Sequence, residues 1–200
     1  FKEILFSDNK FGNTIKKIYE SKNNLLFIDN TDKYAIEKFV KEIFNEETNT
    51  YIFGTGGAAR GAVEALINLN YSSSKIFVIG RNDQKLNLIK DKYNIEIMNI
   101  SRLDNSISIL LNDIQVINCL PPEVPIKKYL SKNIKIIDMT YGIHNFINKN
   151  YYKDYISGYE ILYVQAAYQY MIWYDMKIND KIFSIYKEAI NKYLINTKFR

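Results

Sequence analysis

A glycine-rich turn between an apolar run and a helical pattern constrains the fold of this chain more than any other segment. Residues 51–61 read YIFGTGGAARG, and Gly54, Gly56 and Ala59 fit the spacing G-x-G-x-x-G/A. The first glycine permits a tight turn, the second lets a pyrophosphate approach the backbone, and the small third residue lets the helix pack closely on the strand. The N–H groups at a helix N-terminus attract phosphate. The segment predicts a dinucleotide site, and a glycine-rich turn without a ligand is the alternative. The predicted contacts are Gly54, Thr55, Gly56, Gly57 and Ala58.

Strand and helix patterns alternate through the middle of the chain. Strands that alternate with helices favour right-handed crossovers and a parallel sheet with helices on both faces. The strand patterns are nearly continuous apolar runs, which fits burial on both faces. We therefore expect an α/β fold with a Rossmann-like, doubly wound parallel sheet. The expected strands are 51–53, 75–79, 95–100, 115–119 and 134–139, and the expected helices are 58–69, 83–92 and 103–111.

The two ends of the chain have different patterns. Apolar runs at 14–20 and 24–28 flank a polar turn and predict a hairpin, after which Thr31 opens a helical pattern that ends at the polar stretch 45–49. Helical periodicity returns at 160–173 and 182–194. These changes predict three segments, which are a smaller, partial α/β domain with a connecting helix (1–45), a nucleotide-binding domain (46–158) and C-terminal helices (159–200).

Composition excludes several classes of protein. Of the 200 residues 47% are hydrophobic, which is enough to form a core and too much for a disordered chain. The single cysteine, Cys119, and the single histidine, His144, argue against a disulfide framework and against a cysteine- or histidine-rich metal site. No apolar run approaches the roughly 20 residues that span a bilayer, and no signal peptide is seen, so we expect a cytoplasmic protein with no membrane partner.

The net charge of +5 allows a polyanionic partner. The lysines, however, are scattered along the chain, and the arginines are only Arg60, Arg81, Arg102 and Arg200. Proteins that read nucleic acid usually gather basic residues on one face and use more arginine. We therefore expect a small-molecule partner and no nucleic acid.

The residues after the second predicted strand indicate which dinucleotide binds. A site for NAD usually has an acidic residue at this strand end, where it bonds the ribose 2′-hydroxyl. Here residues 78–82 read VIGRN, and no acid occurs before Asp83. A guanidinium can pair with a 2′-phosphate and stack on adenine. We expect NADP, with Arg81 and Asn82 as contacts, and a solvated Arg81 is the alternative.

Five segments, in order along the chain, resemble motifs of the shikimate dehydrogenases. Gly54–Gly61 resembles the GxGGAxxA loop of that family, and Arg81 is similar to the arginine of its Asn-Arg-Thr segment. The other three segments are Gly12–Thr14, which resembles the end of the GAVNT motif, Asn30–Asp32, which matches NTD, and Gly158–Ala167 followed by Trp173, which resembles G-x-x-M-L-x-x-Q-A and its later tryptophan.

The resemblance implies an NADP-dependent enzyme that interconverts 3-dehydroshikimate and shikimate in aromatic amino-acid biosynthesis. The sequence leaves a monomer and a homodimer equally open. It also implies a substrate domain that faces a Rossmann domain. From the residues alone, a helix N-cap or first-turn acid is the favoured interpretation of Asp32, and Gln165 is a polar residue on a core helix. The residues that the resemblance implies are Lys2 and Asp32 as the acid–base pair, Asn13, Gln165 and Tyr141 at the substrate, and Asn118 at the cofactor.

Some positions depart from that family. After the fourth predicted strand, the family's N-A-T-P-x-G-M is replaced by Asn118–Pro122, which lacks the threonine, glycine and methionine. The family's Ser-rich substrate loop and N-V-T motif are not in this sequence, so the resemblance names no residues for the substrate carboxylate. Two alternatives stay open, namely an NADP-binding relative without this activity and a quinate dehydrogenase.

Overall fold

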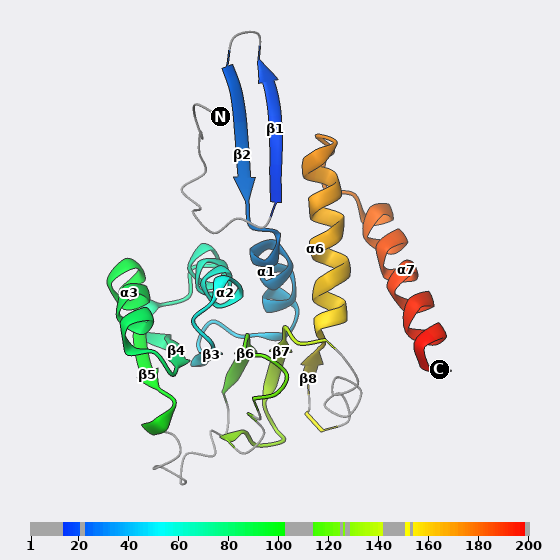
Figure 1. Ribbon diagram of the computed structural model, residues 1–200. Helices are drawn as coiled ribbons and strands as arrows, with labels where there is room; N and C mark the ends of the chain where they lie inside the picture. Colours follow the sequence, from blue (N-terminus) through cyan, green and yellow to red (C-terminus); the bar gives the residue numbers. More distant parts are fainter. Residues whose placement is uncertain are drawn as a thin grey trace. The chain divides into compact units, whose positions relative to one another are not determined.

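The computed structural model describes residues 14–20, 23–102, 114–124, 126, 129–141, 151–152 and 154–198 (Figure 1). The chain divides into two compact units, one of residues 36–158 and the other of residues 1–35 together with 159–200. Helix α1, Thr31–Ile43, belongs to both units, because the division falls after Ala35.

A six-stranded parallel sheet forms the centre of the unit 36–158. The strands lie in the order β5-β4-β3-β6-β7-β8. The chain winds outward from β3 to β5 on one side and from β6 to β8 on the other, so a topological switch point lies between β3 and β6. The predicted α/β fold with a Rossmann-like sheet is confirmed. The bounds are β3 Thr50–Phe53, β4 Ile76–Gly80, β5 Glu96–Asn99, β6 Gln115–Asn118, β7 Lys135–Asp138 and β8 Asp154–Ile156.

Two α-helices and one short 3-10 helix connect the first three strands of this sheet. Helix α2, Gly57–Asn68, and the short 3-10 helix η1, Ser73–Lys75, connect β3 to β4, and α3, Asp83–Tyr93, connects β4 to β5. The buried side of α2 is made mainly of small residues, which permits close packing of a helix on a sheet: Ala59, Gly61, Ala62, Val63, Ala65 and Leu66. The predicted helix at 103–111 lies outside the described residues.

One face of the sheet carries an apolar cluster rich in aromatic rings. Side chains alternate along a strand, so Tyr51 and Phe53 of β3 point to the same face. The ring of Tyr51 stacks on that of Phe77, with centroids 4.7 Å apart. The buried members of the cluster are Tyr51, Phe53, Ile79, Ile114, Val116, Ile126, Leu130, Ile134, Ile136, Tyr152 and Tyr155.

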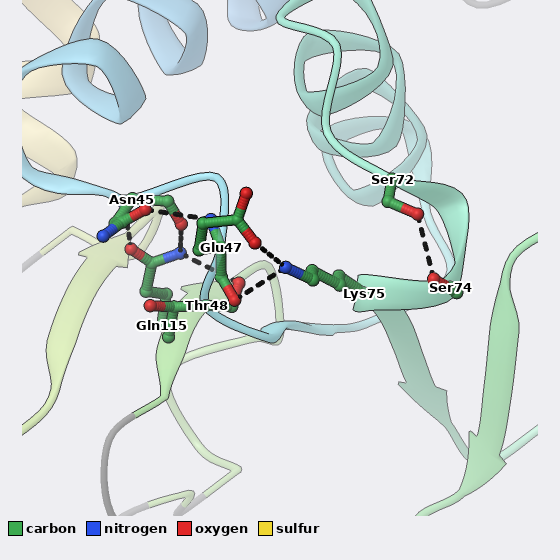
Figure 2. Close-up of polar contacts among 7 residues, drawn as sticks. All are labelled: Asn45, Glu47, Thr48, Ser72, Ser74, Lys75 and Gln115. Carbon is green, nitrogen blue, oxygen red and sulfur yellow. Dashed lines mark hydrogen bonds and ion pairs between the residues drawn. The ribbon is translucent and has the colours of Figure 1, made fainter.

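Hydrogen bonds and an ion pair hold the polar stretch 45–49 at the amino edge of the sheet (Figure 2). The buried Gln115 side chain donates from Nε2 to the carbonyl of Asn45 (2.9 Å) and to Thr50 Oγ1 (3.1 Å), and its Oε1 accepts from the Asn45 backbone N–H. Lys75 Nζ bonds both the carbonyl oxygen and the carboxylate of Glu47. The hydrogen bond from Lys75 and its charge lower the pKa of Glu47. This segment is therefore an ordered connection and not a loose linker.

The other unit contains a hairpin and two long helices. Strands β1, Thr14–Glu20, and β2, Asn23–Asp29, pair antiparallel, with Thr14 opposite Asp29, so the predicted hairpin is confirmed. Helices α6, Gly158–Trp173, and α7, Asp180–Lys198, pack through Ala167, Met171 and Ile182. Among the described residues, no helix has both the length and the apolar character needed to cross a bilayer.

Candidate functional site

The turn after β3 has a backbone that requires glycine at its first position. Gly54 has φ +122°, in the region that residues with a side chain rarely adopt. Its N–H donates to the carbonyl of Ile79 (2.8 Å), and the N–H of Cys119 donates to the carbonyl of Phe53 (2.8 Å), so neighbouring strands hold the turn on both sides. A Cβ at Gly54 would lie 3.0 Å from the Cys119 carbonyl oxygen. Both conformation and space therefore explain this glycine.

The presence of glycine at the next two positions of the turn has a different explanation. A Cβ at Gly56 or Gly57 would meet none of the described residues within 4 Å, so neither glycine is needed for packing in that part of the chain. Gly56 immediately precedes α2 and has no side chain with which to cap it. The first turn of α2 therefore presents its backbone N–H groups beside open space, which is the arrangement that binds phosphate. The predicted reason for the third small residue also holds, because Ala59 is fully buried.

Thr55 links this turn to the end of β4. A Cβ at Gly80 would lie 2.6 Å from the Thr55 Cγ2 methyl, so Gly80 leaves room for that methyl. Arg81 follows Gly80 directly and is exposed. Asn82 caps α3, since its Oδ1 accepts a hydrogen bond of 2.9 Å from the N–H of Lys85. The side-chain oxygen of Asn82 thus caps α3. The Arg81 side chain is exposed and comes just after the end of β4, the strand beside β3.

Asn118 ends β6 at the same edge of the sheet and lies opposite Phe53 in the ladder. It is buried, and its Nδ2 donates to Asp138 Oδ1 (3.0 Å) while its Oδ1 accepts from the N–H of Leu120 (3.2 Å). Asp138 also accepts from the N–H and hydroxyl of Thr140 and from the hydroxyl of Tyr155 (2.9 Å). These donors compensate for burial of the carboxylate, and they give Asp138 a structural role at this edge of the sheet.

Two tyrosines near this network differ in exposure, Tyr141 after the end of β7 and Tyr152 before the start of β8. Tyr141 follows β7 by three residues and is 45% exposed, so its ring is accessible. Tyr152 is buried in the apolar cluster, and burial followed by the nearby Tyr151 and Asp138 raises its pKa, which keeps the phenol neutral. Its hydroxyl has no hydrogen-bond partner among the described residues.

The first turn of α1 shows that Asp32 is not the N-cap of this helix. The Oδ1 of Asn30 accepts a hydrogen bond of 3.1 Å from the N–H of Asp32, so Asn30 is the cap of the helix. Asp32 is a half-buried acid in the first turn. The neighbouring Asp29, which is not among the predicted site residues, is buried and accepts hydrogen bonds from the hydroxyl of Tyr34 (2.7 Å) and from the N–H of Asn30 (2.7 Å). The sequence signal that could have identified Asp29 is an acidic residue at the end of the apolar strand NNLLFID.

Gln165 lies on α6 in the same unit as Asp32. Its side-chain oxygen is buried and has no hydrogen-bond partner among the described residues. A buried amide oxygen without a donor costs about 1–3 kcal/mol, so such an atom usually has a ligand or water as its partner. This observation favours a binding role over that of an ordinary polar residue on a core helix.

The predicted site residues therefore fall into two groups. The turn 54–58, Arg81, Asn82, Asn118 and Tyr141 belong to the unit 36–158, at or just after the carboxyl ends of its strands. Asp32 and Gln165 belong to the other unit. Lys2 and Asn13 lie outside the described residues. The described residues contain no group of three or more His, Cys, Asp or Glu side chains that could hold a metal ion.

Comparison with known proteins gives related sequences and folds, although no family model matches the chain. The chain is 31% identical over 159 residues to the shikimate dehydrogenase (NADP(+)) of Saccharolobus islandicus, a match that covers 76% of this chain and 58% of that protein. It is 32% identical over 186 residues to the pentafunctional AROM polypeptide of Pneumocystis carinii, covering 80% of this chain and 12% of that protein.

A solved structure agrees with these sequence matches. The chorismate mutase/shikimate 5-dehydrogenase fusion protein from Clostridium acetobutylicum superposes with a TM-score of 0.67 and 25% identity, over 95% of this chain and 72% of that one. The chain spans 58% of the length of the Saccharolobus relative, so the similarity concerns a part of that protein.

Proposed function

We propose that the chain belongs to the shikimate dehydrogenase family, as its motifs predict, and that it binds NADP and serves in the reversible reduction of 3-dehydroshikimate to shikimate. The support is the 31% identity to the Saccharolobus shikimate dehydrogenase over 76% of this chain and the similar fold of the Clostridium fusion protein. The activity is proposed for the whole protein, since the chain spans 58% of the length of its Saccharolobus relative. The observation that carries the proposal is the open glycine turn at the switch point of the sheet, followed directly by the N-terminus of α2.

The residues of the unit 36–158 fit a dinucleotide with a 2′-phosphate. Gly56, Gly57 and the first turn of α2 are arranged to receive the pyrophosphate through backbone N–H groups. Arg81 follows β4, where it is suited to pair with the 2′-phosphate. We assign Asn82 the secondary role of fixing the start of α3, because its side-chain oxygen is used in the cap. The bound cofactor supplies the hydride, and the chain supplies position and a proton.

We assign the proton and most of the substrate contacts to the residues of 1–45 and 159–200, and the cofactor to 46–158. In this proposal, the Lys2 ammonium gives its proton to the ketone oxygen, and the Asp32 carboxylate holds and orients that ammonium. The neutral amides of Asn13 and Gln165 bond ring hydroxyls, since an amide can both donate and accept. The buried oxygen of Gln165, which has no hydrogen-bond partner among the described residues, supports this role. Tyr141 is an exposed further contact.

The test is the oxidation of shikimate by the purified protein with NADP, followed by the absorbance of NADPH. Titration of NADP and of shikimate separately, by calorimetry, distinguishes binding from turnover. We expect both ligands to bind and NADPH to form. A protein that binds neither ligand contradicts the proposal.

One observation favours a second candidate, an NADP-binding relative without this activity. Residues 118–122 read NCLPP and lack the threonine, glycine and methionine of the family loop. For this candidate, NADP binds tightly but no NADPH forms with shikimate. The same assay with quinate tests the third possibility, a quinate dehydrogenase, because it compares the rates on the two acids.

A further inference from the structure

Asn99 is the last residue of the edge strand β5 and pairs in register with Gly80, the last residue of β4. The backbone ladder continues one step further, where the N–H of Ile100 donates to the carbonyl of Gly80 (2.9 Å). Beyond that step, the side chain of Asn99, and no longer the backbone, makes the hydrogen bonds between the two segments. Its Nδ2 donates to the carbonyl of Arg81 (3.4 Å) and to Asp83 Oδ1 (2.7 Å).

The oxygen of the same side chain is also used. Asn99 Oδ1 accepts from the backbone N–H of Ser101 (3.1 Å) and from its hydroxyl (2.9 Å). An amide has two N–H donors and two acceptor sites, so the four contacts use its whole capacity. Reversal of the amide would lose the contacts with the Arg81 carbonyl, the Asp83 carboxylate and the Ser101 N–H, so its orientation is fixed. One side chain thus joins the loop after β4 to the segment after β5.

The connection made by Asn99 matters because the loop after β4 contains two side chains of opposite charge. Arg81 and Asp83 are two residues apart, and both are exposed. A carboxylate near a guanidinium competes with any incoming anion for it and also repels that anion. Asn99 is a neutral donor, and its short contact holds the Asp83 carboxylate at the β5 side of the loop. It holds the carbonyl of Arg81 at the same time.

We propose that Asn99 is a positioning residue that sets the preference for NADP over NAD, because it fixes the Arg81 backbone and keeps Asp83 engaged, so that the guanidinium is available to a 2′-phosphate. This inference rests on the proposed function, since it requires that the protein bind NADP through Arg81. It adds to that function a residue which contacts neither the phosphate nor the reacting atoms.

The test compares the Kd values of NADP and NAD for the full chain by calorimetry, in the wild type and in Asn99→Ala. Loss of the hydrogen bonds that hold the loop should weaken NADP about fivefold to tenfold and leave NAD within about twofold. Asn68→Ala is the matched control, because Asn68 also bonds a carboxylate, that of Glu37 (2.9 Å), but lies at the end of α2. The control should keep both affinities.

A second variant separates positioning from general damage. In Asp83→Asn the carboxylate is absent, so the further change Asn99→Ala should reduce the NADP preference less than it does in the wild type. Equal reductions in the two backgrounds would show that Asp83 is not what Asn99 controls, and would overturn the proposal. So would an unchanged ratio of NADP to NAD affinity in Asn99→Ala. A wild type that binds no NADP at all would instead reject the proposed function, and this inference with it.

Discussion

The side-chain oxygen of Asn30 lies 3.1 Å from the backbone nitrogen of Asp32 and accepts its hydrogen bond, so the helix that contains Asp32 is capped by its neighbour. Asp32 is therefore not needed as the cap. The Asp32 carboxylate can be changed without loss of that hydrogen bond, whereas a change at Asn30 removes it. The pair allows a structural and a chemical role to be tested separately.

For Asp32→Asn we expect turnover with shikimate to fall by at least ~100-fold, because an amide cannot orient or balance an ammonium as a carboxylate does. NADP affinity and the midpoint of thermal unfolding should change little. The matched variant Asn30→Ala should behave in the opposite way, with a loss of about 1 kcal/mol in the free energy of unfolding from the missing cap. Full activity in Asp32→Asn would leave this residue as a first-turn acid only.

Replacement of Arg81 should alter cofactor choice. In Arg81→Ala the lost charged contact should weaken NADP by about 1.5–3 kcal/mol, while NAD binding changes little because NAD has no 2′-phosphate. Calorimetry with each dinucleotide measures the two affinities. Lys90→Ala, an exposed basic residue on α3, is the control for net charge. Equal losses for NADP and NAD would contradict the assignment of Arg81.

The first two glycines of the turn should respond differently to alanine. Gly56 has φ −82° and open space around it, so Gly56→Ala should fold as well as the wild type, yet its methyl should hinder the pyrophosphate and weaken both dinucleotides by about tenfold or more. Gly54→Ala should lose stability, because φ is +122° and the Cys119 carbonyl is 3.0 Å away. Thermal unfolding and dinucleotide titration of both variants check this contrast. Unchanged dinucleotide binding in Gly56→Ala would argue against a pyrophosphate at the turn.

Gln165 should show a conflict between stability and function. Gln165→Met removes a buried oxygen that lacks a partner among the described residues, so the free energy of unfolding should rise by about 1 kcal/mol. The KM for shikimate should rise by about tenfold, because a thioether cannot bond a ring hydroxyl in the same way. Gln169→Met, one turn further along α6, is the control. If Gln165→Met lost stability and kept its KM, Gln165 would be a core residue only.

Much of the fold could be predicted because the strands are continuous apolar runs and the helices between them are periodic. The hairpin, the turn and the order of elements from β3 to β7 follow from those patterns. Strand β8 was missed, since Asp154–Ile156 is only three residues long and gains its place from pairing with β7. Pairing with a distant strand cannot be seen in so short a run.

The candidate site was predictable to the extent that backbone requirements leave a mark on sequence. A glycine that a turn needs can be found by its spacing, but the use of a side chain depends on its neighbours in space. The motif that suggested Asn82 as a cofactor contact could not show that its oxygen caps α3. Likewise, the contact between Asn99 and Asp83 joins residues 16 positions apart, and only the register of β4 and β5 brings them together.

The three glycines of the turn are required for two different reasons. Gly54 is required by its own backbone and by the nearby Cys119 carbonyl, while Gly56 and Gly57 have no described residue close enough to require a glycine. A randomised library screened only for expression of folded protein should retain Gly54 and let the other two drift. A library that must also retain a nucleotide should keep all three, so sequencing the survivors of both screens would read out the ligand's demands separately from those of the fold.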